Sequence, residues 1–183
     1  MSARGLRVWL PMVVAFGGAL GACNELQNTS VADEFMEGID APVVWGMVSY
    51  ITTNGVRQAR VRADTAFTYA DSAKIDLRVM SVDFYDEGGV ERATVRGERG
   101  EWNQDTDLMV ARGNVELLVH SDSSVIRSQE IHYDPQSDRI WSDSATSRTM
   151  TDGTVTSGSA FESDIEFTNI RILNVRGDAG RIF

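Results

Sequence analysis

The sequence predicts an all-β protein in which an antiparallel sheet folds over on itself. The first observation is alternation: apolar Val115, Leu117 and Val119 are separated by single residues such as Glu116. Side chains of a strand point to opposite faces with a period of two, so this pattern is typical of a half-buried strand. The second observation is that clusters of Asn, Asp, Gly, Ser and Pro interrupt the chain about every 8–12 residues, as in antiparallel β proteins. These clusters lie at 103–105, 112–114, 121–124 and 134–138.

The third observation is an internal repeat. A strand-like segment begins at Val61-Arg62-Ala63 and continues, after two residues, with Ala66-Phe67. Similar segments begin at Val95 and Ile126, and a looser one begins at Thr156, so the starts lie 30–34 residues apart. Such spacing is typical of stacked supersecondary units. Each unit reads as a strand, a turn around Asp and a return strand.

Composition and charge restrict the classes of function. The chain of 183 residues is 42% hydrophobic and 24% charged, which indicates one folded domain rather than a disordered chain. The net charge is −10, and removing an N-terminal leader with Arg4 and Arg7 would take it to −12. An acidic surface repels phosphate backbones, so no nucleic-acid partner is expected. The same charge argues against a broad electrostatic grip on anionic lipid headgroups.

The N-terminus has the features of a secreted lipoprotein. Residues 1–7 carry two arginines, and residues 8–20 form an apolar run too short for a comfortable transmembrane helix. The run closes with Leu20-Gly21-Ala22-Cys23, which resembles the bacterial lipobox. This resemblance implies a signal peptide over 1–22 and a mature chain that begins at Cys23 with thioether-linked diacylglycerol and an amide-linked fatty acid such as palmitate. Two or more chains make stable membrane anchoring. Cys23 is the only cysteine, so no internal disulfide can form.

The elements are then expected in chain order. Residues 23–42 are polar and acidic and predict a tether that ends at Pro42. The β domain is expected over 43–175, with a frayed tail at 176–183. Asn54-Gly55 predicts a hairpin turn, and the slip in alternation between Val79 and Val82 predicts a bulge. Strands are expected at 43–51, 56–69, 77–86, 142–149, 154–161 and 165–175, besides those within 93–143.

A set of apolar side chains shares one predicted face of the sheet. One interpretation is that they fill a closed sandwich core. The other is that the sheet is open along one edge, and that these side chains line a slot for hydrocarbon. The set consists of Phe67, Tyr69, Val79, Phe84, Trp102, Val115, Leu117, Val119, Ile131 and Tyr133.

No catalytic, cofactor or metal site is predicted. His120 and His132 lie on separate predicted strands, and a zinc site needs three or four converging ligands. No Gly-x-Ser-x-Gly, P-loop or dinucleotide fingerprint is present. The protein is therefore expected not to be an enzyme and to bind no cofactor. Asp residues are abundant at the predicted turns, where Asp stabilises the turn itself. A hydrolase would need a convergent pair of carboxylates in a cleft, and that alternative stays open.

The order of several motifs resembles the LptC family of lipopolysaccharide-export proteins, and more broadly the domain that LptC shares with LptA. The resemblance covers about residues 43–175. It rests on Ala111-Arg112-Gly113-Asn114-Val115, on Tyr133-Asp134-Pro135 through Trp141-Ser142-Asp143, and on Gly158-x-x-Phe161-Glu162-Ser163-Asp164. These are turn-and-strand motifs without catalytic residues.

The resemblance implies a twisted, open antiparallel β-jellyroll whose apolar groove holds the acyl chains of lipopolysaccharide. The implied partners are lipopolysaccharide, the β-jellyroll domains of an inner-membrane ABC transporter and an LptA-like periplasmic bridge protein. The expected location is the periplasmic face of the inner membrane, with outer-membrane anchoring as an open alternative. One departure is that well-studied LptC proteins carry a transmembrane helix, whereas this chain has the features of a lipoprotein. A structural envelope lipoprotein with a closed core and no lipid ligand is the alternative function.

Overall fold

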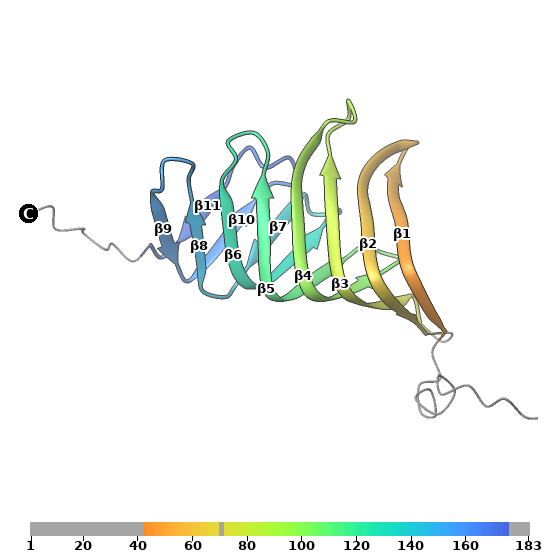
Figure 1. Ribbon diagram of the computed structural model, residues 1–183. Coiled ribbons are helices and arrows are strands. Elements are labelled where there is room, and N and C mark those ends of the chain that lie inside the picture. Colours follow the sequence, from red (N-terminus) through yellow and green to blue (C-terminus); the bar gives the residue numbers. More distant parts are fainter. Residues whose placement is uncertain (1–41, 70–71, 176–183) are drawn as a thin grey trace, which may run out of the picture. The chain divides into compact units, whose positions relative to one another are not determined.

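The computed structural model describes residues 42–69 and 72–175, which form one antiparallel sheet of 11 strands without an α-helix (Figure 1). This confirms the predicted all-β, antiparallel class. No helix in this part of the chain is long and apolar enough to cross a membrane. The predicted signal peptide, almost all of the tether with Cys23, and the tail at 176–183 lie outside the described residues. The strands are β1 Val43–Thr53, β2 Val56–Thr68, β3 Lys74–Tyr85, β4 Glu91–Asn103, β5 Met109–Val119, β6 Val125–Asp134, β7 Arg139–Ser142, β8 Thr146–Thr149, β9 Val155–Gly158, β10 Ala160–Ser163 and β11 Arg171–Leu173.

Strand order in the sheet follows the order of the chain. Each of β1 to β6 pairs with the next strand, and β10 and β11 continue the sheet beyond β7. Strand β8 pairs with the other half of β6, and β9 pairs with β8. The sheet therefore divides at β6 into two branches and has three free edges, β1, β9 and β11, so it is open as predicted.

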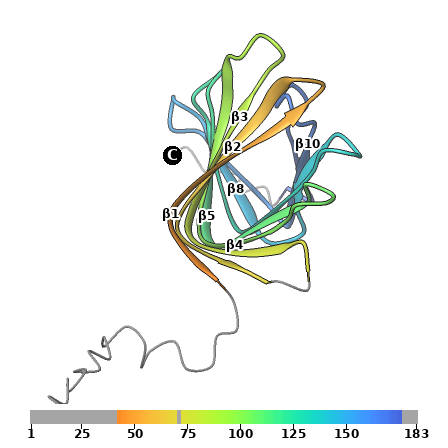
Figure 2. The same ribbon diagram turned by 90° about the vertical axis from the view of Figure 1, so that its right-hand side faces the viewer.

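A crease crosses the long strands at one level and bends the sheet into two layers. The pairing ladder is interrupted at Gly46, Asp64 and Val79 in β1, β2 and β3, and the register shifts beside Gly113 and Asn114 in β5. Four of these residues have positive φ: Gly46 at 60°, Val79 at 48°, Gly113 at 80° and Asn114 at 46°. A left-handed residue redirects the strand, so the two halves of each strand enter different layers, as the view along the sheet shows (Figure 2).

The internal repeat coincides with this architecture. Val61, Val95 and Ile126 lie on alternate strands in one row across the sheet, in register with Val82 and Leu117. The two residues that separate the halves of each repeat lie at the crease. The repeat is thus one bent strand followed by its return strand.

The last part of the chain differs from the prediction. The strand expected at 142–149 is two strands, because β7 ends and β8 begins on opposite sides of the crease. Buried hydroxyl groups satisfy one another at this corner: Ser128 Oγ lies 2.8 Å from Ser142 Oγ, and Thr146 Oγ1 donates to Ser128 Oγ at 3.3 Å. The strand expected at 154–161 is likewise divided into β9 and β10 at Ser159.

The strand predicted over 165–175 is wrong except at β11. Residues 164–170 form a turn instead, because the Asp164 carboxylate accepts hydrogen bonds from the backbone N–H groups of Thr168 and Asn169 and from both their side chains. Phe167 within this turn has φ of 59°. Short polar side chains that bond to nearby backbone compete with strand pairing.

Candidate functional site

The apolar interior between the two layers is the main candidate site. Seven of the ten predicted residues belong to it, and none of them exposes more than 4% of its surface. Val82 and Val95 from one layer and Ala111 and Ile131 from the other line the same small void. The seven residues are Phe84, Trp102, Val115, Leu117, Val119, Ile131 and Tyr133.

Phe67 and Tyr69 are not part of this interior, so their prediction is wrong. Phe67 pairs with Asp76 on the outer face, and the Tyr69 hydroxyl donates to the Asp76 carboxylate at 2.9 Å. The cause is the interruption at Asp64. Inward-facing residues of a strand are normally two positions apart, but in β2 the inward-facing residue after Ala63 is Ala66, three positions on. Simple alternation therefore assigns the second half of β2 to the wrong face.

Val79 is also outside the interior. It is the interrupting residue of β3, with positive φ and 70% of its surface exposed. The predicted irregularity in β3 is real, but it lies at Val79 itself, and Met80 resumes the inward face. Sequence reasoning missed Met80, Leu77, Ile140 and Phe167 as interior residues. The repeat contained a usable signal, because Ala66, Gly100 and Ile131 of successive repeats form one inward row with Leu77.

The interior is packed rather than hollow. The void lined by Met80, Phe84, Met109, Tyr133 and Ile140, among others, has a volume of about 10 Å³. That is no more than the space one water molecule needs. The sheet is open at its ends, but the void at this place between the layers, as formed by residues 42–69 and 72–175, is far smaller than the expected slot for an acyl chain.

A second, larger cavity lies at the rim, where the layers come together opposite the crease. It measures about 190 Å³ and is lined on one side by Phe84 and Tyr85 and on the other by Tyr133, Asp138 and Ile165. A hollow of about 440 Å³ lies outside, at the crease between β5 and β6, and is lined mainly by polar residues such as Asn114, Glu116 and Arg127. The rim cavity is the one that adjoins the apolar interior, because Phe84 and Tyr133 line both.

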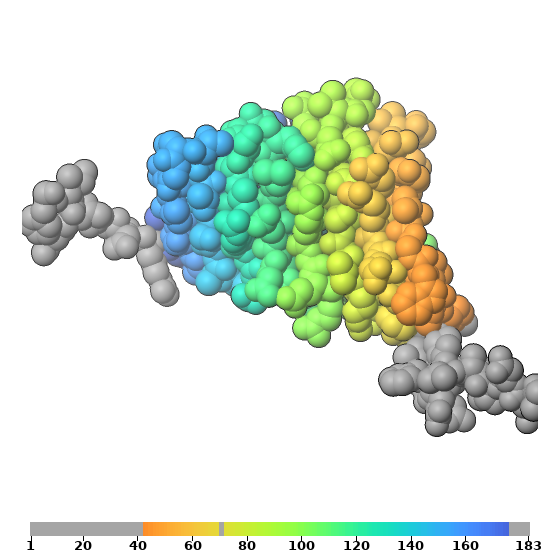
Figure 3. Space-filling view, in the orientation of Figure 1, coloured from red at the N-terminus to blue at the C-terminus, as the bar shows by residue number. Residues whose placement is uncertain are grey.

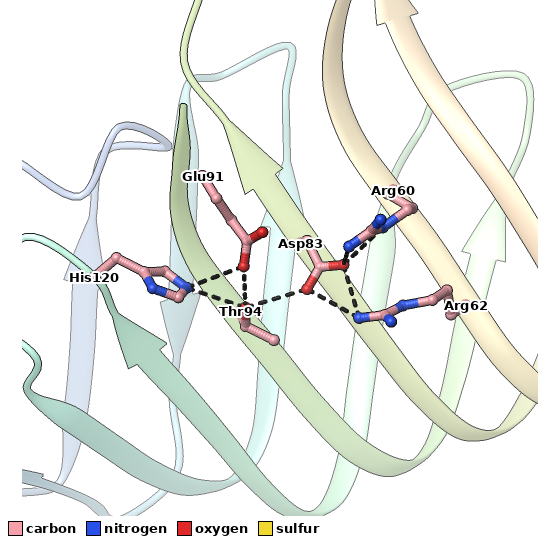
Figure 4. Close-up of polar contacts among 6 residues, drawn as sticks. All are labelled: Arg60, Arg62, Asp83, Glu91, Thr94 and His120. Atoms are coloured by element: carbon pink, nitrogen blue, oxygen red, sulfur yellow. Dashed lines mark hydrogen bonds and ion pairs between the residues drawn. The ribbon is translucent and has the colours of Figure 1, made fainter. Parts of the chain in front are cut away.

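A polar cluster covers part of the outer face on β2, β3 and β4 (Figure 4). Asp83 lies at its centre with 2% of its surface exposed. Its carboxylate accepts hydrogen bonds from Arg60 Nε at 2.9 Å, Arg60 Nη2 at 2.8 Å and Arg62 Nη2 at 2.8 Å. Two guanidinium groups compensate the one buried charge, which ties β2 to β3.

Thr94 connects this ion cluster to Glu91 and His120. Its Oγ1 lies 3.1 Å from Asp83 Oδ1, 3.0 Å from Glu91 Oε1 and 3.2 Å from His120 Nε2. Glu91 Oε1 lies 3.2 Å from the same histidine nitrogen. A catalytic triad needs its hydroxyl and its acid on different nitrogens of the imidazole ring. This geometry is therefore that of a surface hydrogen-bond network. The carboxylates of Asp83 and Glu91 both accept hydrogen bonds from protein side chains.

His132 has a different environment from His120. Its ring stacks on Trp141 with centroids 5.1 Å apart, and its Nε2 lies 3.3 Å from Glu130 Oε1. Within residues 42–69 and 72–175, no group of three or more His, Cys, Asp and Glu side chains is placed to hold a metal ion.

The edge strand β1 is a second candidate site. It pairs only with β2, and its 11 residues include no charged side chain. Trp45, Val48 and Tyr50 lie on its outer face with 75%, 55% and 50% of their surfaces exposed. It stands at one end of the layer seen in the space-filling view, with β8 and β9 at the other (Figure 3). Soluble proteins usually protect edge strands with charges or proline, so an uncharged edge of this length indicates a surface for strand addition.

Comparison with known proteins identifies the family. Residues 46–179 match the lipopolysaccharide-assembly, LptC-related family. The chain belongs to this family. LptC-related proteins serve lipopolysaccharide transport across the periplasm, and the protein accordingly takes part in that process.

A solved structure is similar to about two thirds of this chain. The crystal structure of LptH, the LptA-homologous periplasmic component of the lipopolysaccharide transport device of Pseudomonas aeruginosa, is 16% identical to this chain. The match has a TM-score of 0.48 and covers 66% of this chain and 85% of LptH. No curated protein matches the chain.

Proposed function

We propose that this LptC-related protein is a lipid-anchored, periplasmic transfer protein for lipopolysaccharide. It receives lipopolysaccharide from an inner-membrane ABC transporter and passes it along a bridge of β-jellyrolls toward the outer membrane. The protein itself catalyses no reaction and binds no nucleotide, so the transporter supplies the energy.

The observation that carries this proposal is the inner face of the bent sheet. One inward row runs through Val61, Val82, Val95, Leu117 and Ile126, so apolar side chains line the sheet across five strands. Leaving hydrocarbon in water costs about 25 cal/mol for each Å². An acyl chain crossing the periplasm therefore needs such a lining, and the layers must separate to admit it because the resting interior is full.

The β1 edge supports the proposed handover between jellyrolls. A partner strand that pairs with β1 would add backbone hydrogen bonds, and Trp45, Val48 and Tyr50 would supply apolar contact. The partner is a β-jellyroll domain of the transporter or of an LptA-like bridge protein. Strand addition would continue the inner face from one domain into the next.

The anchor is part of the proposal. Cys23 would carry the acyl chains, and residues 24–42 would tether the domain to the periplasmic face of the inner membrane. Replacing Cys23 by Ser should abolish incorporation of labelled palmitate. Continued labelling of that variant would contradict the assignment of Cys23.

The test of transport is a photoreactive amino acid placed at the inner face in living cells. We expect a lipopolysaccharide adduct from position 117 or 133. Positions 118 and 132 are matched controls, because Leu118 and His132 are adjacent in the chain and belong to the outward-facing set. If the inward positions give no more adduct than the outward ones, the proposed lipid-binding interior is wrong.

One observation favours a second function. A void of about 10 Å³ is what a closed structural core would leave. In a structural envelope lipoprotein, Leu117→Ala would lower the free energy of unfolding by about 2–5 kcal/mol, as an ordinary core truncation does. It would leave lipopolysaccharide export unchanged at temperatures where the variant is folded.

A further inference from the structure

Three aromatic rings close the rim between the two layers. The ring of Phe84 on β3 lies 4.9 Å from that of Tyr133 on β6 and 5.6 Å from that of Phe167, measured between centroids. All three residues are buried, with 3%, 4% and 5% of their surfaces exposed. The three come from different parts of the chain, so their contact joins one layer, the other layer and the turn at 164–170.

Phe84 and Tyr133 separate two spaces. On the outer side is the rim cavity of about 190 Å³. On the inner side is the void of about 10 Å³, whose other walls include Val95, Ala111 and Ile131. A molecule that moved from the rim cavity into the interior would pass between these two rings.

Phe167 is held in place differently from the other interior residues. Its backbone has φ of 59°, and its N–H donates to the Asp164 carbonyl at 3.2 Å. The turn is fastened by the Asp164 side chain and by a 3.3 Å bond from Ile165 N–H to Asp138. No strand pairing holds residues 164–170. Phe167 is therefore a core residue carried on a segment that can leave without breaking the sheet.

We propose that the place of the Phe167 ring is the entry site for a single hydrocarbon chain. The proposal rests on the proposed function and specifies where the ligand enters. An alkyl chain would displace Phe167 from the rim, pass between Phe84 and Tyr133 and reach the inner rows of both layers. The exchange replaces one apolar contact with another, so the interior stays dry throughout.

The acidic rim restricts what enters to the hydrocarbon part of a ligand. Asp86, Glu87, Asp138 and Glu166 border the rim cavity, although Asp86 is paired with Arg92 at 2.9 Å. An anionic headgroup would be repelled there unless its charge were neutralised. The chain end can pass, and the headgroup would stay outside the rim.

The test uses lauric acid that carries a photoreactive diazirine, with labelled peptides identified by mass spectrometry. The full-length chain with Cys23→Ser also carries the pair of changes Glu87→Cys and Glu166→Cys, at two sides of the rim cavity. A short reducible cross-linker then fixes residues 164–170 to the β3–β4 turn. We expect at least fivefold less labelling of the peptides with Val95 and Ala111, and recovery when the cross-link is reduced.

A matched control pair keeps the comparison specific. Glu116→Cys and Arg127→Cys lie opposite one another on β5 and β6 at the outer face, so their cross-link should not change interior labelling. Phe167→Leu, a milder change than truncation to Ala, should increase interior labelling about threefold without a cross-link.

The outcomes separate this proposal from the proposed function. Interior labelling that the rim cross-link leaves unchanged would overturn the entry site and leave the lipid-binding interior standing. Labelling of no interior peptide in any variant, including Phe167→Leu, would overturn both.

Discussion

Gly158 on β9 lies against Ile172 and Leu173 of β11. A Cβ atom at this position would lie 2.2 Å from the Leu173 carbonyl oxygen and 2.6 Å from Ile172 Cγ2. The Leu173 carbonyl oxygen belongs to the backbone, so it cannot rotate away as a side-chain atom can. The absence of a side chain is therefore what lets β9 lie against β11.

The substitution Gly158→Ala should lower the free energy of unfolding by about 2–3 kcal/mol, because overpacking forces backbone shifts. Urea denaturation monitored by tryptophan fluorescence measures the change. Gly153→Ala is an instructive comparison, since nothing lies within 4 Å of its added Cβ and only its φ of 85° would oppose the change. If Gly158→Ala lowers the unfolding free energy by less than Gly153→Ala does, the layers can separate freely at this end.

The Asp83 carboxylate forms ion pairs with two outward-facing guanidinium groups. Replacing it by Asn leaves Arg60 and Arg62 without their shared counter-charge. We expect a loss of about 3 kcal/mol in unfolding free energy, at the low end for a broken buried ion pair, because the arginines are themselves 31% and 43% exposed. Glu116→Gln is the control: its pair with Arg127 is exposed and should contribute less than about 1 kcal/mol. Similar effects of the two variants would contradict the role given to Asp83.

The residue scale also shows where sequence reasoning succeeds and fails. Alternation placed Leu117 and Ile131 correctly, because each lies within one half of a strand. It failed for Phe67, because the interruption at Asp64 shifts inward positions by one residue. Asp64 itself carries no signal for that shift, but the two-residue spacing that recurs before Ala66, Gly100 and Ile131 in successive repeats does. In the structure, the shift appears as the break in strand pairing at Gly46, Asp64 and the left-handed Val79.

At the scale of elements, β1 differs from all other edges of the sheet. It is 11 residues long, whereas β9 and β11 have four and three residues. A short edge offers few backbone groups, so β1 is the edge that can hold a partner strand.

Two lysines on the outer face of β1 should prevent this association. We expect Val48→Lys with Tyr50→Lys to abolish cross-links between a photoreactive residue at Thr52 and any jellyroll partner in cells. Both side chains are exposed, but they lie opposite Arg62 and Arg60, and Tyr50 also contacts the Arg57 guanidinium. We therefore expect each change to lower the unfolding free energy by up to about 1 kcal/mol, which leaves the domain folded. Val155→Lys on β9 is the control, since its side chain is 59% exposed on the short edge. Unchanged cross-linking of the double variant would rule out β1 as the docking strand.

The turn at 164–170 should loosen at low pH. Burial alone would raise the pKa of the Asp164 carboxyl, but the hydrogen bonds from Thr168 and Asn169 outweigh it and hold the pKa below the ordinary 3.8. A carboxylate with a lowered pKa stabilises the folded state above the unfolded pKa and loses that contribution as the pH falls through its folded pKa. Hydrogen exchange of the Phe167 amide should therefore accelerate below about pH 4, relative to core amides of β4.

The variant Asp164→Asn tests the assignment, because it removes the titrating group and should give rapid exchange at every pH. If the variant keeps the parent's pH dependence, another group controls the turn. The turn itself was not predictable from the pattern of residues 165–175, whose alternating apolar residues favour a strand. The local bonds of Asp164 override that preference.

At the scale of the molecule, the two layers share their strands. Each of β1 to β6 contributes residues to both layers, so neither layer can unfold while the other stays intact. We expect Leu117→Ala in one layer and Ile131→Ala in the other to shift one and the same unfolding transition by about 2–5 kcal/mol each. Calorimetry that resolved two transitions would contradict this coupling.

The bent, open sheet was predictable as a class because the turn clusters and the repeat indicate short antiparallel strands at regular spacing. The closed rim was not, since it depends on Phe84, Tyr133 and Phe167 meeting from three distant parts of the chain. Contacts between segments of such separation leave no periodic trace in the sequence. The same limit applies to the packed interior, whose volume depends on how far the layers close.

The sequential order of the strands has a consequence for how the protein acquires its structure. Because β1 through β6 each pair with the strand that follows, each new strand up to β7 can add to a neighbour that has already formed. A chain that emerges from a secretion pore N-terminus first could add one strand after another to the growing sheet, because these pairings need no contact with segments far along the chain. For the same reason, evolution could lengthen or shorten this part of the sheet by one hairpin at a time, since the remaining strand pairings would stay unchanged.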